Sequence, residues 1–140
     1  QERGRGGKAT SIRFQGGCAC GAVRYESSAD PQFSFHCQCR QCQRASGTGH
    51  ASLFVVPADA LTLRGTLKFH DQKADSGSTA SRGFCSTCGS PILNKSAGYA
   101  DVRFIHAASL DDPSLFKPKK LVWSAGAQPW DYVDPGLERT

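Results

Sequence analysis

Short stretches in which apolar and polar side chains alternate run along most of the chain, separated by turn residues. Leu67 and Phe69, for example, alternate with Lys68 and His70, as expected for a strand with one buried and one solvent-facing side. Similar stretches, rich in β-branched and aromatic residues, are 22–26, 33–36, 51–56, 61–63, 67–71, 79–84, 91–94, 102–107 and 121–124. This pattern predicts a mainly β fold.

Signals for helices are few. Residues 38–45 contain neither Gly nor Pro and predict a short helix, and residues 111–115 predict another short helical turn. Neither is long enough to be stable in isolation. The polar segment 75–78 predicts a surface loop.

The chain of 140 residues has the size of one domain. Residues 1–11 are basic and rich in Gly, so we expect a flexible leader there and one domain over 12–140. No apolar run approaches the roughly 20 residues that cross a bilayer. The opening residues also lack the apolar centre of a secretory signal, so we expect a cytoplasmic protein that does not bind membranes.

The formal net charge of +5 counts all cysteines as neutral. If the cysteines bind metal as thiolates, much of this positive charge is cancelled. Lys117, Lys119 and Lys120 form the one tight basic group, and Pro118 interrupts it. A nucleic-acid partner is therefore not expected.

The cysteines are the most informative residues. Their number, seven, is odd, and a reducing compartment disfavours disulfides, so metal binding explains them better. They form three clusters: C-x-C at Cys18 and Cys20, C-x-C-x-x-C at Cys37, Cys39 and Cys42, and C-x-x-C at Cys85 and Cys88.

The first and last clusters together supply the four thiolates of a closed structural zinc site. Their ligands are Cys18, Cys20, Cys85 and Cys88. Glycines beside both pairs permit the tight turns that bring neighbouring sulfurs together. Such a site would join two distant parts of the chain and make metal binding part of folding.

The middle cluster supplies three ligands, which is typical of a catalytic zinc whose fourth position is exchangeable. Three thiolates form a soft ligand set that favours a thiol substrate. The total expected is two zinc ions per chain. A histidine could instead close this site; the possible residues are His36, His50, His70 and His106. His36 is disfavoured because neighbouring residues of a strand point to opposite faces. Metal-free or redox-active thiols are the remaining alternative.

Together the clusters resemble the family of glutathione-dependent formaldehyde-activating enzymes, which also contains the centromere protein V type domains. The resemblance extends over about residues 14–137. The matching segments are 17–21 (GCACG), 36–42 (HCQCRQC) with Gly47, 82–90 (RGFCSTCGS), 109–113 (SLDDP) and 129–130 (PW).

The resemblance implies a β-tent of small antiparallel sheets stapled by a structural zinc on Cys18, Cys20, Cys85 and Cys88. It also implies a second zinc on Cys37, Cys39 and Cys42. The implied activity is that of a carbon-sulfur lyase, an S-(hydroxymethyl)glutathione synthase that joins glutathione to formaldehyde. Arg40 and Arg44 are then the expected contacts for the substrate carboxylates, and Trp123 and Trp130 are expected to pack the core or to cover the pocket.

Three other functions stay open at this point. An enzyme of the same fold could act on a different small substrate. A non-catalytic zinc module could bind protein or nucleic acid. Finally, the middle cluster could release its metal on oxidation and form a disulfide switch. No general base is evident in the sequence.

Overall fold

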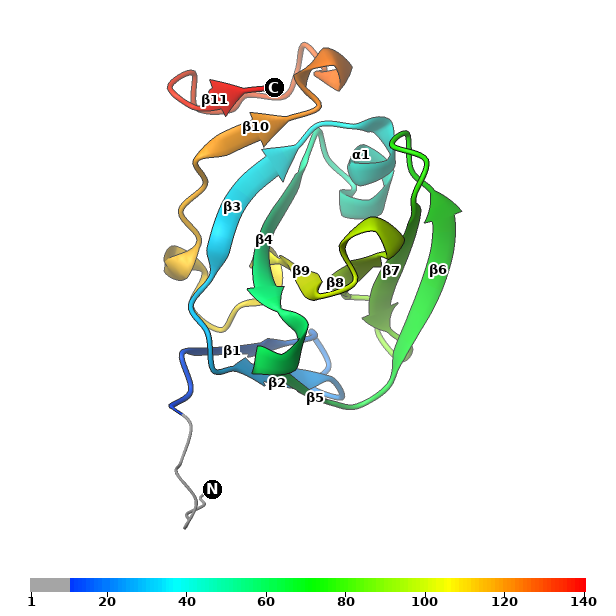
Figure 1. Ribbon diagram of the computed structural model, residues 1–140, viewed down its shortest axis with the longest axis vertical. Helices are drawn as coiled ribbons and strands as arrows, with labels where there is room; N and C mark the ends of the chain where they lie inside the picture. The colour runs from blue at the N-terminus through cyan, green and yellow to red at the C-terminus, as the bar shows by residue number, and fades with distance from the viewer. Residues whose placement is uncertain (1–10) are drawn as a thin grey trace.

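The computed structural model describes residues 11–140, which form two β-sheets (Figure 1). The smaller sheet is antiparallel and has the strand order β1-β2-β5. Its strands are β1 (Phe14–Gly17), β2 (Arg24–Ser27) and β5 (Leu61–Arg64). It lies at the end of the molecule opposite β11 (Glu138–Arg139).

The larger sheet has eight strands in the order β11-β10-β3-β4-β9-β8-β7-β6. Besides β11, its strands are β3 (Gln32–Cys37), β4 (Ala51–Pro57), β6 (Leu67–Lys73), β7 (Thr79–Cys85), β8 (Pro91–Ser96), β9 (Val102–His106) and β10 (Lys120–Val122). The sheet curves around helix α1 (Arg40–Ser46) (Figure 1). Short 3₁₀ turns lie at Ala58–Ala60, Ala97–Tyr99, Ala107–Ser109, Pro113–Leu115 and Ser124–Gly126.

The mainly β prediction is confirmed, and each predicted strand is present with small shifts of its ends. The helix predicted over 38–45 is α1, and only 113–115 of the second predicted turn is helical. Segment 75–78 lies in the turn between β6 and β7. The predicted leader, apart from residue 11, lies outside the described residues. No helix within residues 11–140 is long and apolar enough to cross a membrane.

Strands β1 and β11 were not expected, and neither were two parallel pairs in the larger sheet. Strand β10 runs parallel to both β3 and β11. A long connection, residues 107–119, separates β9 from β10, and this length lets the chain return in the direction of β3. The expectation of small antiparallel sheets therefore describes the three-stranded sheet, while the second sheet is larger and mixed.

Alternation along the strands gives the larger sheet two different faces. In β4, Phe54 and Val56 belong to the core shared with the smaller sheet, whereas Leu53 and Val55 belong to a second cluster on the other face. The shared core contains Phe14, Val23, Tyr25, Phe54, Val56, Cys85, Ile92, Leu93, Ile105, Ala107 and Leu110. Complete burial of a side chain such as Phe54 contributes about 1.5–3 kcal/mol.

The second cluster lies on the face that α1 covers. Its buried members are Phe35, Cys37, Cys42, Ala51 and Leu53, with Phe104 packed against them. Cys37 and Cys42 are thus buried together on the same face of the sheet. The middle group of cysteines is therefore separated from the main core by the sheet itself.

Candidate metal centres and the adjoining cavity

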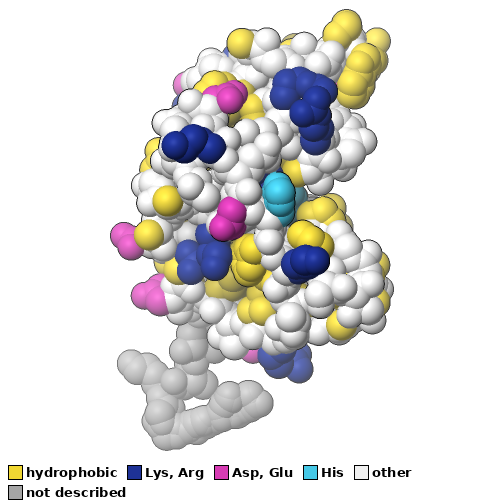
Figure 2. All heavy atoms as spheres, turned by 90° about the vertical axis from the view of Figure 1, so that its right-hand side faces the viewer, with side chains coloured by type: hydrophobic (Ala, Val, Ile, Leu, Met, Phe, Trp, Pro, Cys, Tyr) yellow, Lys and Arg dark blue, Asp and Glu magenta, His cyan; other side chains and the backbone are white. Residues whose placement is uncertain are grey.

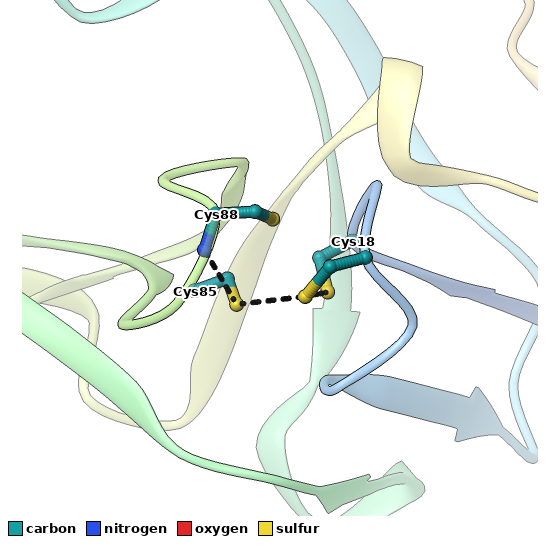
Figure 3. Close-up of side chains that lie close together, drawn as sticks. Cys18, Cys85 and Cys88 are labelled. Atoms are coloured by element: carbon teal, nitrogen blue, oxygen red, sulfur yellow. Dashed lines mark hydrogen bonds between the residues drawn. The ribbon is translucent and has the colours of Figure 1, made fainter.

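Four cysteines from two loops meet where the smaller sheet approaches β7 (Figure 3). Cys18 and Cys20 follow β1, and Cys85 and Cys88 lie at the end of β7 and on the turn beyond it. All four sulfurs lie within 4.8 Å of one another. The Sγ atoms of Cys18 and Cys20 are 3.6 Å apart, and those of Cys20 and Cys85 are 3.8 Å apart. A tetrahedron with zinc-sulfur bonds of about 2.3 Å has sulfur-sulfur edges of about 3.8 Å, so this group fits a tetrahedral metal ion.

Backbone N–H groups point at these sulfurs. Val23 donates to Cys18 Sγ at 3.2 Å, and Thr87 and Cys88 donate to Cys85 Sγ at 3.3 and 3.4 Å. Hydrogen bonds of this kind favour the thiolate over the thiol. The two loops are therefore shaped to hold anionic sulfur, which is the form that binds metal.

Ser90 links the two cysteine loops. Its hydroxyl oxygen accepts a hydrogen bond from the Ala19 N–H at 3.1 Å and lies 3.2 Å from Cys88 Sγ, to which it donates. Hydrogen bonds, first among them that from the Ser90 side chain, lower the pKa of Cys88 to about 5. Ser90 ends the motif over residues 82–90, but the sequence alone does not indicate this role.

The other three cysteines form a second group, here called the three-cysteine cluster. Cys37 ends β3, Cys39 caps the N-terminus of α1, and Cys42 lies in its first turn. Their sulfurs also lie within 4.8 Å of one another. Hydrogen bonds from Cys37 and Cys42 to the Cys39 sulfur, together with the nearby charge of Arg82, hold the pKa of Cys39 well below its usual range.

No histidine joins the three-cysteine cluster within residues 11–140, and no fourth Cys, Asp or Glu does so. His36 lies on the opposite face from Cys37, as alternation predicts, and its Nδ1 is 3.0 Å from the Ser52 hydroxyl. The other three histidines also have different surroundings: His50 bonds Asp131, His106 bonds Asn94, and His70 is exposed on β6.

A cavity of about 160 Å³ adjoins the three-cysteine cluster and is here called the cysteine cavity. Cys37, Cys39 and Cys42 all line it. Its apolar wall comes from Phe35, Leu53 and Phe104, on one face of the larger sheet. Its polar lining includes Gln41, Asp75, Arg82 and Asn94, and Trp123 lies along it as well.

Arg82 is the cation that approaches the cluster from β7. Its charge contributes to the lowered pKa of Cys39, and at Cys42, whose pKa is raised overall, it opposes the other effects. Its Nη1 lies 3.4 Å from Gln41 Oε1. Its Nε is buried and has no hydrogen-bond partner within the part of the chain described. Arg82 begins the motif over residues 82–90, but only the pairing of β7 with β8 shows that it lines this cavity.

Arg40 and Arg44, predicted to bind substrate, lie on α1 and are exposed. The guanidinium of Arg40 donates to Gln43 Oε1, and neither arginine lines the cysteine cavity. A role for them in binding substrate stays a prediction about the surface outside the cavity.

Trp123 has an unusual backbone. Its φ of 57° and ψ of 39° lie in the left-handed region, and its side chain is 47% exposed. A bulky residue in this conformation is strained. The strain occurs at a residue that lines the cysteine cavity, in agreement with the expectation that Trp123 covers a pocket.

The fold and the two cysteine groups define a mainly β protein equipped to hold metal. The sequence profile described as glutathione-dependent formaldehyde-activating enzyme matches residues 13–126, and the chain belongs to this family. A crystal structure of a Rhodobacter sphaeroides protein is similar in fold, with a TM-score of 0.55 and 22% sequence identity over 90% of this chain and 99% of that chain. A search of curated proteins found no significant match.

The strain at Trp123 can be measured by comparing Trp123→Gly with Trp123→Ala. Both substitutions remove the indole, but glycine adopts a positive φ without the clash that a Cβ atom brings. We expect the glycine variant to be more stable by about 1 kcal/mol in urea unfolding. Equal stabilities of the two variants would contradict the left-handed backbone at this position.

Proposed function

We propose that this protein is a zinc-dependent carbon-sulfur lyase that joins a thiol to an aldehyde and reverses the same reaction. The proposed substrates are glutathione and formaldehyde, and the proposed product is S-(hydroxymethyl)glutathione. The observation that carries the proposal is the three-cysteine cluster, whose sulfurs line a cavity and which no fourth protein ligand closes within residues 11–140. Membership of the family supports the same reaction.

Both cysteine groups suit zinc. Cys18, Cys20, Cys85 and Cys88 would hold a structural ion, and Cys37, Cys39 and Cys42 would hold a second one. Zinc at the three-cysteine cluster would supply a Lewis acid that lowers the pKa of a bound thiol. The seven cysteines must remain reduced to bind metal, so a reducing compartment such as the cytoplasm is part of the proposal.

The surrounding side chains prepare the cavity for a thiolate. Phe35, Leu53 and Phe104 form an apolar wall on one side of the cavity, and Arg82 supplies positive charge beside the sulfurs. In the reaction, a sulfur lone pair forms the carbon-sulfur bond while the carbonyl electron pair moves to oxygen. The proton that the thiol gave up to water when it bound then returns from water to that oxygen and gives the hydroxyl group of the product.

The size of the cavity decides how a tripeptide thiol would bind. At about 160 Å³ it is smaller than the roughly 300–1,000 Å³ of pockets that enclose a whole drug-sized ligand. We therefore place the thiol and the aldehyde inside and most of the peptide outside. Arg40 and Arg44 on α1 would contact peptide carboxylates there.

The alternative of a non-catalytic module that binds nucleic acid needs a continuous basic surface. On the face drawn in Figure 2, the Lys and Arg side chains are separated from one another, and acidic side chains lie among them. The face drawn in Figure 2 therefore offers no continuous basic surface to a nucleic acid.

Metal analysis tests the assignment of the two groups. Protein purified without added zinc is expected to carry about two zinc ions per chain, one for each cysteine group. Cys39→Ser should lower this to about one and retain the fold, because the four-cysteine group (Cys18, Cys20, Cys85 and Cys88) is intact. Cys85→Ser should instead unfold the domain, since structural zinc contributes about 10–16 kcal/mol in small zinc domains. Unfolding of the Cys39→Ser variant in circular dichroism would show that both groups are structural.

Glutathione binding can be tested on cobalt-substituted protein, in which thiolate binding changes the charge-transfer absorption. We expect glutathione to change this spectrum because the three-cysteine cluster leaves one tetrahedral position to an outside ligand. S-methylglutathione, whose sulfur is blocked, is the matched control and should leave the spectrum unchanged. An unchanged spectrum at millimolar glutathione would contradict the proposed function.

A further inference from the structure

Arg82 and Asn94 stand side by side on the wall of the cysteine cavity. They are register partners in the antiparallel pair of β7 and β8, and both line the cavity. Side chains of directly opposed residues lie on the same face, with Cβ atoms about 5 Å apart. The sheet therefore presents a guanidinium and an amide together beside the three-cysteine cluster.

His106 orients the amide of Asn94. The two side chains are buried, and His106 Nε2 lies 3.3 Å from Asn94 Oδ1. Burial lowers the pKa of His106 to about 4, with the charge of Arg82 adding to the effect, so the ring is neutral at pH 7. An amide oxygen only accepts, so His106 donates from Nε2. Because Oδ1 accepts the hydrogen bond from His106, the Nδ2 hydrogens of Asn94 are available to a ligand in the cavity.

Arg82 likewise offers donors that the protein does not use. Its Nε is buried without a partner, its Nη1 meets only the neutral Gln41, and within residues 11–140 no carboxylate lies within ion-pair distance of it. Asp75 also lines the cavity, but it is an exposed residue of the β6–β7 turn. A buried, unpaired donor is costly unless a ligand satisfies it.

Lys95 does not take the place of Arg82. Although it lines the cavity, its Nζ lies 4.2 Å from the centre of the Phe69 ring. It follows Asn94 in β8, so its side chain leaves the strand on the other face. The positive charge directed at the cysteine cavity is therefore that of Arg82.

We propose that Arg82 and Asn94 form a donor pair that binds an anionic oxygen of the substrate next to the three-cysteine cluster. This inference rests on the proposed function. Two oxygens have the required chemistry: the alkoxide that forms on the aldehyde carbon when sulfur attacks it, and a carboxylate of the thiol substrate. Donors aimed at a developing alkoxide stabilise the transition state, whereas donors to a carboxylate strengthen binding.

The donor pair can be tested without any reaction. In ¹⁵N NMR spectra of the zinc-loaded protein, acetate should shift the Arg82 Nε–H and Asn94 Nδ2–H₂ signals in the millimolar range. The signals are assigned by their loss in Arg82→Lys and Asn94→Leu. If neither signal moves as acetate is added, the donor pair is wrong. This result is independent of whether the protein binds thiols.

Three variants distinguish binding of the alkoxide from binding of a substrate carboxylate. They are Arg82→Gln, Asn94→Leu and the control Arg64→Gln. Arg64 is an exposed residue of β5 outside the cavity, so its variant matches the change in charge alone. If the donors bind a carboxylate, Arg82→Gln should weaken the binding of glutathione about 10-fold more than that of 2-mercaptoethanol, a thiol that has no carboxylate. If they bind the alkoxide, thiol binding should persist while kcat falls about 100-fold.

Each variant is compared at equal zinc content and after circular dichroism has shown a native fold. Arg82→Lys keeps the charge and should recover part of the loss. Variants that match Arg64→Gln in both binding and kcat would overturn the proposal, as would an effect of Arg82→Gln that disappears once zinc content is equalised. Failure of the wild-type protein to bind thiol would instead refute the proposed function and leave the acetate experiment to decide on the donor pair.

Discussion

Successive side chains of a β-strand point to opposite faces of its sheet, and the larger sheet of this protein uses that constraint to keep two environments apart. On one face Phe54 and Ile105 pack against the smaller sheet. On the other, Leu53 and Phe104 pack with Cys37 below α1 and border a cavity. A shift of one residue in the register of β4 would exchange the two sets. The main core and the three-cysteine cluster therefore depend on the same strand pairing.

The four-cysteine group connects the two sheets. Cys18 follows a strand of the smaller sheet, and Cys85 ends a strand of the larger one, 67 positions further along the chain. Thiolates cost free energy to bring together unless hydrogen bonds or a metal neutralise them, and here backbone N–H groups and Ser90 provide part of that neutralisation. A metal ion on these sulfurs would make folding and metal binding one event. The two-sheet arrangement that shapes the cavity then rests on this group.

Much of the fold could be predicted from local pattern. Alternating apolar and polar residues located the longer strands, and the spacing of cysteines located both groups of sulfurs. Strand β1 escaped prediction because it ends in Gly16 and Gly17, which have low strand propensity, and pairing with β2 overrides that preference. Strand β11 has two residues and exists through its pairing with β10. Both omissions have the same origin, since partners distant in sequence stabilise these strands.

The sequence by itself determined which side chains are able to bind metal, because ligand type and close spacing are local properties. It also indicated that His36 and Cys37 point apart, because alternation is a local property too. Only the tertiary structure decided that Arg82 and Asn94 face the three-cysteine cluster while Arg40 and Arg44 lie outside the cavity. Their positions follow from the register of strands that pair across the sheet, and no local pattern contains that register.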